Sequence, residues 1–256
     1  MFYSFITYAF LGWGLEVLYH LYKQKRFVNR GFLNGPLCPI YGITAVLLIL
    51  FLTPISENIL YVFVGGAIIA SLLELITGYL LEAFFNTKWW DYSDEKFNFK
   101  GYICVRFSII WGFISIIFLK VINVQVSKFT TWLSYFNSEI LYHILLILLI
   151  VDIALTINSL ITFRKLFIDL QEVLVETKNN VEKLRELKLT TEAKENIQLR
   201  VSHLMDIKER MASRVSLRHK ALLRAYPQIT SKKFGTAIEE IKSRVNKVNI
   251  KKRSKH

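Results

Sequence analysis

The sequence contains few cysteines and lacks the common motifs of metal and nucleotide chemistry. Cys38 and Cys104 are its only cysteines among 256 residues. No group of His, Cys, Asp and Glu has a recognised metal-ligand spacing, and no Gly-x-x-x-x-Gly-Lys-Ser/Thr phosphate loop occurs. We therefore expect no metal site and no cofactor. ATP hydrolysis by way of a phosphate loop is excluded.

Charged residues are scarce in five long apolar stretches. Hydrophobic residues make up 53% of the chain and aromatic residues 14%. Apolar stretches of about twenty residues predict membrane-spanning helices rather than one soluble domain. We predict an all-α membrane protein in which Gly65 and Gly66 allow close helix contact or a bend. Its five transmembrane helices are expected at residues 2–22, 38–53, 59–85, 103–122 and 140–163.

Basic residues are unevenly divided among the connections. Residues 54–58 contain no Lys or Arg and residues 123–139 contain only Lys128, whereas basic residues gather in the other two connections and after the fifth span. Because cytoplasmic connections are rich in Lys and Arg, we expect the N-terminus outside and the C-terminal tail in the cytoplasm. Cys38 and Cys104 then lie on the reducing side, where a structural disulfide is not expected. The first span also lacks the basic start and cleavage site of a signal peptide.

The charge divides the chain into two parts. Residues 1–163 contain 10 Lys and Arg against 9 Asp and Glu, a net charge of +1. Residues 164–256 contain 23 against 11, a net charge of +12, which together reproduce the +13 of the chain. We predict a transmembrane domain at residues 1–165 and a basic, helical cytoplasmic tail at residues 166–256.

The stretch 29–42 (Asn-Arg-Gly-Phe-Leu-Asn-Gly-Pro-Leu-Cys-Pro-Ile-Tyr-Gly) is irregular, although apolar segments flank it. Non-helical backbone at membrane depth is tolerated only where protein buries it or a wet cavity satisfies its polar groups. A rigid turn beside Arg30 could hold an anionic headgroup or a phosphate. A purely architectural re-entrant turn is equally consistent with the sequence. The residues expected to shape the turn are Gly31, Gly35, Pro36, Pro39 and Gly42.

Three short sequence motifs follow one another along the chain. The first joins Gly-Trp-Gly-Leu-Glu at 12–16 to the 29–42 stretch, and the second is Glu-Leu-Ile-Thr-Gly-Tyr-Leu-Leu-Glu at 74–82. The third runs from Trp-Trp-Asp-Tyr-Ser at 89–93, through Phe97-Asn98 and Gly101, to Trp111-Gly112. Over roughly residues 1–165 the chain resembles the bacterial family described as "putative ABC-transporter type IV permease", and Arg-Ala-Tyr-Pro at 224–227 fits the same family. The resemblance implies a transport permease, and the missing phosphate loop then implies a separate ATPase subunit.

Four acids lie within predicted spans, where a charged group costs about 3 kcal/mol at the helix centre. No Lys or Arg lies deep enough to pair with the central ones. Glu74, Gly78 and Glu82 share one helix face, with the two carboxylates about 12 Å apart along the axis. That spacing is too long for one acid/base pair. It suits two separate positions along a polar seam, that is, a line of polar residues on one helix face that is open to the cytoplasm. The four acids are Glu16, Glu74, Glu82 and Asp152.

Two interpretations stay open for these acids. They could bind or conduct a cation, a proton or a polar substrate. Alternatively, they could form hydrogen bonds that only hold the helices together. Glu16 and Glu82, near the interface, could also simply reach water. Trp89, Trp90 and Tyr92 fit an aromatic belt at the headgroup level. Further candidates for a polar path or binding site are Arg30, Asn29, Asn34, Asp91 and Asn98.

The tail has a helical pattern. Apolar residues and a threonine at 170, 174, 177, 181 and 184 predict a coiled-coil-like stripe that continues the fifth span. A second helix is expected at about 192–226 and a third at 231–248. Anionic lipids of the cytoplasmic leaflet are the first expected partner of this basic tail, followed by self-association or a protein partner. Nucleic acid is not expected, because no recognition motif occurs.

Three functions follow from these features. The first is an integral membrane transport-type protein, such as the permease component of an ABC-type system with its ATPase on another chain. The second is a membrane-embedded enzyme or binding protein for a lipid or isoprenoid substrate at the cytoplasmic face, although no catalytic constellation stands out. The third is a membrane scaffold or sensor. In each case we expect a multi-pass protein of the bacterial cytoplasmic membrane, and a homo-oligomer is an option.

Overall fold

The computed structural model describes residues 1–25, 27–135, 139–185 and 190–253, and most of these are helical. The chain opens with α1 (Phe2–Gln24), α2 (Pro39–Leu52) and α3 (Ile59–Phe85), with a 3₁₀ turn η1 (Thr53–Ile55) after α2. Pro39 begins α2 at a position where its missing N–H costs nothing. Asn58 caps α3 by accepting the N–H groups of Leu60 and Tyr61. The observed α3 coincides with the predicted third span.

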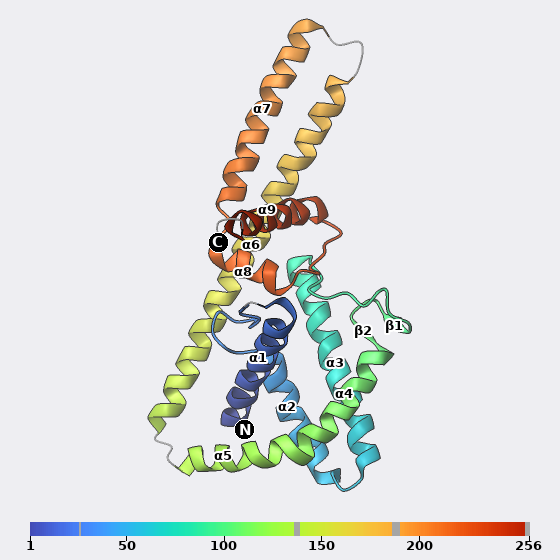
Figure 1. Ribbon diagram of the computed structural model, residues 1–256, viewed down its shortest axis with the longest axis vertical. Helices are drawn as coiled ribbons and strands as arrows, with labels where there is room; N and C mark the ends of the chain where they lie inside the picture. The colour runs from blue at the N-terminus through green and yellow to red at the C-terminus, as the bar shows by residue number, and fades with distance from the viewer. Residues whose placement is uncertain (26, 136–138, 186–189, 254–256) are drawn as a thin grey trace.

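The chain after α3 forms a short hairpin and then a bent helix. Strands β1 (Asn98–Phe99) and β2 (Ile103–Cys104) pair antiparallel, and α4 (Val105–Ile117), the π turn η2 (Phe118–Ile122) and α5 (Asn123–Tyr135) follow without a break. Most of the expected connection at 123–139 is therefore helical. The extra residue of a π turn bends a helix, and α5 lies across the end of the bundle in Figure 1.

The last part of the chain contains α6 (Glu139–Leu184), α7 (Thr191–Ser213), α8 (Leu217–Ala225) and α9 (Gly235–Arg253). The 46-residue α6 runs unbroken from the apolar segment into the tail, which confirms the expected continuation. The single helix predicted at 192–226 is wrong: the chain leaves the helix after Ser213, and Ser216 caps α8 by accepting the N–H of His219. Figure 1 shows α6 and α7 projecting together as a hairpin.

Three helical segments in the described residues are long and apolar enough to cross a membrane: Ile59–Phe85, Val105–Leu133 and Glu139–Leu184. The α2 segment, Pro39–Ile55, is shorter, spanning about 25 Å of helix against a hydrocarbon core of about 30 Å. The α1 helix is long enough, but Glu16, His20 and Lys23 lower its hydropathy. The structure therefore supports a membrane protein with three candidate spans rather than establishing five.

Small residues bring the helices of the bundle close together. The most extensive pairings are α3 with α4, α1 with α2, and α6 with α7. A Cβ at Gly66 of α3 would collide with Ser115 of α4, and one at Gly112 would lie 2.7 Å from the Phe63 ring. The predicted close contact at Gly65 and Gly66 is confirmed, since Gly65 likewise meets Leu52.

One hydrophobic cluster joins the bundle to the tail. Its central residues include Leu160, Phe163 and Phe167 of α6 together with Trp89, which follows α3. Residues from α8, α9 and their flanks complete it: Val215, Leu222, Leu223, Ile229, Phe234, Ala237, Ile238, Ile241 and Val245. Figure 1 shows the loops 25–38 and 86–104 at the same end of the bundle as α8 and α9, and opposite the N-terminus and α5.

Candidate functional site

The loop at 25–38 is shaped by its own side chains. The Asn29 side-chain oxygen accepts the indole N–H of Trp13 at 2.7 Å and the backbone N–H of Gly31 at 2.9 Å. The Asn29 amide donates to the Asn34 carbonyl at 3.1 Å. A Cβ at Gly31 would lie 2.8 Å from the Gly35 carbonyl oxygen, so only glycine permits this close turn. The loop is a pre-arranged turn fastened to α1.

The Arg30 side chain is held on three sides. Its guanidinium pairs with Glu16 at 2.8 Å, donates to the Ala225 carbonyl at 2.8 Å, and lies 5.2 Å from the centre of the Tyr226 ring. The Tyr41 hydroxyl donates to the other oxygen of Glu16 at 2.6 Å. Arg30 therefore links α1 to the end of α8. The hydrogen-bonding capacity it could offer to an anionic headgroup is already partly used.

Asp152 anchors the same loop to α6. Its two carboxylate oxygens accept the backbone N–H groups of Asn34 and Gly35, each at 2.9 Å. The hydroxyl of Thr156, one turn further along α6, accepts from the Asn34 backbone and side chain at 3.1 Å. A carboxylate held by two N–H groups forms strong, charge-assisted hydrogen bonds. This anchor explains how an acid is accommodated on an otherwise apolar helix.

The other predicted turn residues divide between the loop and α2. Pro36 is exposed in the loop, and Pro39 is the first residue of α2. Gly42 lies inside α2 rather than in the turn, because the helix already starts at Pro39. A Cβ at Gly42 would lie 2.7 Å from the Phe5 carbonyl oxygen, so this glycine lets α1 and α2 approach each other.

The predicted seam on α3 faces aromatic side chains. Glu74, only 8% exposed, accepts the Tyr92 hydroxyl at 2.9 Å and the Trp111 indole N–H at 3.2 Å. Glu82 accepts the Tyr102 hydroxyl at 2.7 Å. Between the two acids, a Cβ at Gly78 would lie 3.0 Å from the Tyr102 ring. Glu74, Gly78 and Glu82 thus share one face, as their spacing indicates, and the 86–104 loop covers that face.

Asp91 and Asn98 build the covering loop itself. Asp91 accepts the Ser93 backbone N–H at 3.0 Å and lies 3.6 Å from the Lys88 ammonium. Partial burial alone would raise the pKa of Asp91, but the Ser93 bonds and the Lys88 charge hold that pKa below its ordinary value. The Asn98 amide donates to the Ser93 and Glu95 carbonyls. Both residues therefore bind backbone of their own loop.

Trp90 and Tyr92 both have partners within the protein. The Trp90 indole donates to the Tyr102 carbonyl at 2.9 Å, and the Tyr92 ring stacks on Phe107 at 4.7 Å. Burial and the Glu74 carboxylate raise the pKa of Tyr92, so its hydroxyl stays protonated and donates.

The candidate residues fall into two clusters. The first cluster, around loop 25–38, contains Glu16, Asn29, Arg30, Asn34 and Asp152; the second cluster, around loop 86–104, contains Glu74, Glu82, Asp91 and Asn98. In the described part of the chain, no hydrogen bond or ion pair directly joins a candidate of one cluster to a candidate of the other. Aromatic contacts connect the two clusters instead: Trp89 meets Phe32 at 5.8 Å and Tyr226 at 4.8 Å.

Tyr side chains and backbone groups are expected partners of buried acids, but sequence reasoning did not identify which residues these are or the part that the tail plays. Tyr41, Tyr92, Tyr102 and Trp111 supply the donors. Their spacing along the chain carries no signal, because each belongs to a different element from the acid it meets. From the tail, Arg218 donates to the Phe32 carbonyl at 2.8 Å, and strand-like bonds of 2.8 and 2.9 Å pair Lys88 with Thr230.

Cys38 and Cys104 are both buried and free. Among the residues that the structure describes, no group of three or more His, Cys, Asp and Glu side chains could hold a metal ion.

The comparisons with known proteins give one positive finding. A family model described as "Putative ABC-transporter type IV" matches residues 3–157. Comparison with curated proteins and with solved structures finds no significant match. The matched segment includes both loops, every acid of the two clusters and three-fifths of the chain. On this evidence the chain belongs to the family of putative type IV ABC transporters.

Proposed function

We propose that this chain is the permease component of an ABC-type transport system whose ATPase is a separate chain. The family match over residues 3–157 is the observation that carries this proposal. The three candidate spans support it, since a permease must cross the bilayer. The sequence has no phosphate loop, so a partner would have to supply ATP hydrolysis.

A five-pass arrangement in the bacterial cytoplasmic membrane belongs to the same proposal. It places α1 and α2 in the bilayer beside the three candidate spans, with the N-terminus outside. Loops 25–38 and 86–104 and the tail then share the cytoplasmic side, in keeping with their common end of the bundle (Figure 1). An ATPase would meet the protein on this side.

The polar path in this proposal follows the acids of the two clusters. Glu74 is the deepest of them on the α3 seam, and it is held by two neutral donors rather than by a cation. A cation or a polar substrate could replace Tyr92 and Trp111 as its partner. With few helices per chain, a second copy could contribute the opposite wall of the path.

The test of this proposal starts from the full chain, gently purified from its own membrane. We expect native mass spectrometry to find a co-purifying ATPase subunit. In the double variant Glu74→Gln/Glu82→Gln, ATP hydrolysis by that complex should fall while the subunits stay associated, because the variant keeps the shape and loses the charge. A Tyr79→Phe variant, changed at an exposed side chain of the same helix, is the control.

A second function, a membrane scaffold or sensor, is favoured by one observation: the four acids all find donors within the protein. In a scaffold these acids only hold helices and loops together. The absence of any co-purifying ATPase, together with normal behaviour of Glu74→Gln/Glu82→Gln, would favour the scaffold and count against the permease.

A further inference from the structure

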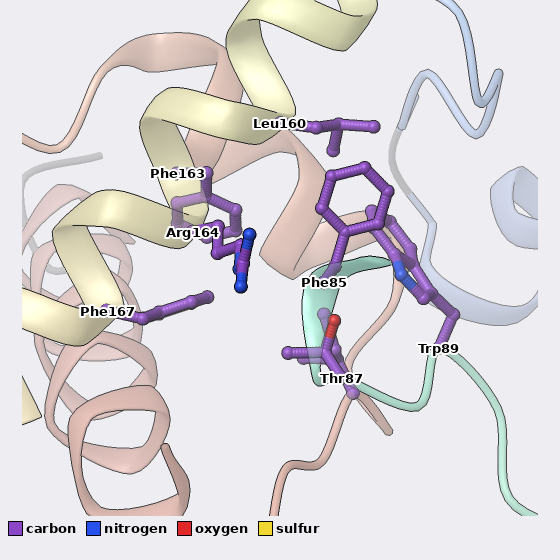
Figure 2. Close-up of a pocket in the computed structure, with 8 residues that line it drawn as sticks. Phe85, Thr87, Trp89, Leu160, Phe163, Arg164 and Phe167 are labelled. Carbon is purple, nitrogen blue, oxygen red and sulfur yellow. The ribbon is translucent and has the colours of Figure 1, made fainter. Parts of the chain in front are cut away.

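A recess between α6 and the end of α3 combines apolar walls with unused hydrogen-bond donors. It is a shallow, half-open depression: the space between its atoms comes to about 230 Å³ only when the open solvent at its mouth is counted. Phe85, Thr87 and Trp89 line one side, while Leu160, Phe163, Arg164 and Phe167 of α6 line the other (Figure 2). Ile229, from the chain before α9, completes the lining. None of these residues belongs to the two clusters of the candidate transport path.

Trp89 has a buried donor that nothing in the described chain accepts. Its side chain is 4% exposed, and the indole N–H has no hydrogen-bond partner within the described residues. Leaving such a donor buried and unpaired is unfavourable, because it has lost its hydrogen bonds to water. Contacts with Phe32 and Tyr226 fix the indole, so the N–H is held in place at the recess. A fixed, unsatisfied donor of this kind is suited to an acceptor from outside the protein.

Arg164 adds a positive charge on the opposite wall. Its guanidinium extends from α6 toward the space between Phe163 and Phe85 (Figure 2). It forms no hydrogen bond, ion pair or ring contact with any described residue, unlike Arg30 and Arg218. Thr87, which is buried, also lines the recess and adds a hydroxyl group. The polar side chains on the recess, those of Arg164, Trp89 and Thr87, can all donate hydrogen bonds, and Arg164 is also a cation.

The position of the recess identifies the source of the acceptor. Arg164 is the first basic residue after the apolar part of α6, and Phe85 is the last residue of α3, so the recess lies where both candidate spans end. Phosphate groups of the lipids occupy this depth. The aromatic and aliphatic walls match an acyl chain better than they match a free ion in water.

We propose that this recess binds the phosphate of an anionic phospholipid, with Arg164, the Trp89 N–H and the Thr87 hydroxyl as donors. The acyl chains extend along the exposed apolar face of α6, of whose most apolar window only 11% is buried. Because the recess also holds Ile229 of the tail and Trp89 of the 86–104 loop, the lipid fastens the tail to the bundle. This inference does not depend on a transport function.

The test uses the full chain in nanodiscs or micelles titrated with phosphatidylglycerol, with phosphatidylcholine for comparison, and native mass spectrometry counts the bound lipids. Trp89→Phe keeps the ring and the net charge, and we expect about fivefold weaker phosphatidylglycerol binding from the lost N–H. Arg164→Gln should weaken binding about tenfold more than Lys165→Gln. Lys165, the exposed neighbour, controls for the general attraction of a cation to an anionic surface, up to about fivefold.

Two results would overturn the proposal. One is unchanged phosphatidylglycerol binding in Trp89→Phe together with equal losses in Arg164→Gln and Lys165→Gln, with thermal unfolding confirming that the variants are folded. The other is a protein that takes up inorganic phosphate as tightly as phosphatidylglycerol, which would make the ligand a free anion. Selective loss of phosphatidylglycerol with no effect on phosphatidylcholine would support the site.

Discussion

At the scale of single residues, Gly35 shows how an intramembrane acid depends on a missing side chain. An added Cβ would lie 2.8 Å from the Asp152 carboxylate, which accepts the N–H groups of Asn34 and Gly35 itself. In Gly35→Ala the carboxylate must move and release these bonds. We expect a loss of about 1–3 kcal/mol in the free energy of unfolding, measured by thermal or denaturant unfolding in detergent.

Gly14→Ala is the matched control for this prediction. Gly14 lies within α1, and a Cβ added there has nothing within 4 Å. Because alanine favours the helix over glycine, this variant should be neutral or more stable by up to about 1 kcal/mol. Equal stability of Gly35→Ala and the native protein would mean that Asp152 does not hold the loop.

At the scale of the elements, the apolar runs predict the bundle helices well. The α3 bounds match because an apolar run there starts after the Asn58 cap and ends where Asn86 adopts a left-handed conformation. The seam of Glu74 and Glu82 follows from helical periodicity alone. The break after Ser213 was missed, since the apolar pattern continues across Val215 and Leu222 and only the Ser216 cap marks it.

The partners of the seam could not be predicted, because they depend on the tertiary fold. Tyr92 and Tyr102 lie ten positions apart in one loop, yet they contact acids two turns apart on α3. Arg30 was predicted as a candidate for a polar path or binding site, and that role stays a prediction. Its bonds to Glu16 and to the tail could not be inferred, because no local pattern places Ala225 beside a loop almost two hundred residues away.

The docking of α8 on α6 should depend on pH through His219. This histidine is 5% exposed, stacks on Phe163 at 4.4 Å and contacts the Ser159 carbonyl at 3.1 Å. Burial lowers the pKa of His219 in the folded protein below its ordinary value, and the nearby Arg218 charge lowers it further. The bond to the Ser159 carbonyl acts in the opposite direction but does not outweigh them. The unfolded state therefore binds more protons, and stability is complete above about pH 6.5 and falls as the pH drops through the lowered pKa.

The measurement is thermal unfolding of the native protein and of His219→Gln between pH 7.5 and pH 5.5. We expect the native protein to lose more stability over this interval than the variant, which cannot take up that proton. His203→Gln, altered at an exposed histidine of α7, should keep the native pH dependence. A pH dependence that persists unchanged in His219→Gln would assign it to other groups.

At the scale of the whole molecule, the tail is packed as a part of the core. Phe234, 1% exposed before α9, stacks near Phe167 of α6 in the same cluster as Trp89. The predicted domain boundary between residues 165 and 166 lies close to the point where the net charge of the chain changes, yet the cluster includes residues from both sides of it. Phe234→Ala removes a large buried side chain, and such changes cost about 3–5 kcal/mol.

If bundle and tail unfold as one unit, this change in the tail should reach the 86–104 loop. The Lys88 N–H donates to the Thr230 carbonyl at 2.8 Å, so its hydrogen exchange reports on that contact. We expect Phe234→Ala to speed exchange at Lys88 and to lower the unfolding temperature of the whole chain. Leu217→Ala, which alters a side chain that is 84% exposed, should do neither. Loss of α9 protection with native exchange at Lys88 would instead show that the two parts unfold separately, and the boundary at 165 would then be a true domain boundary.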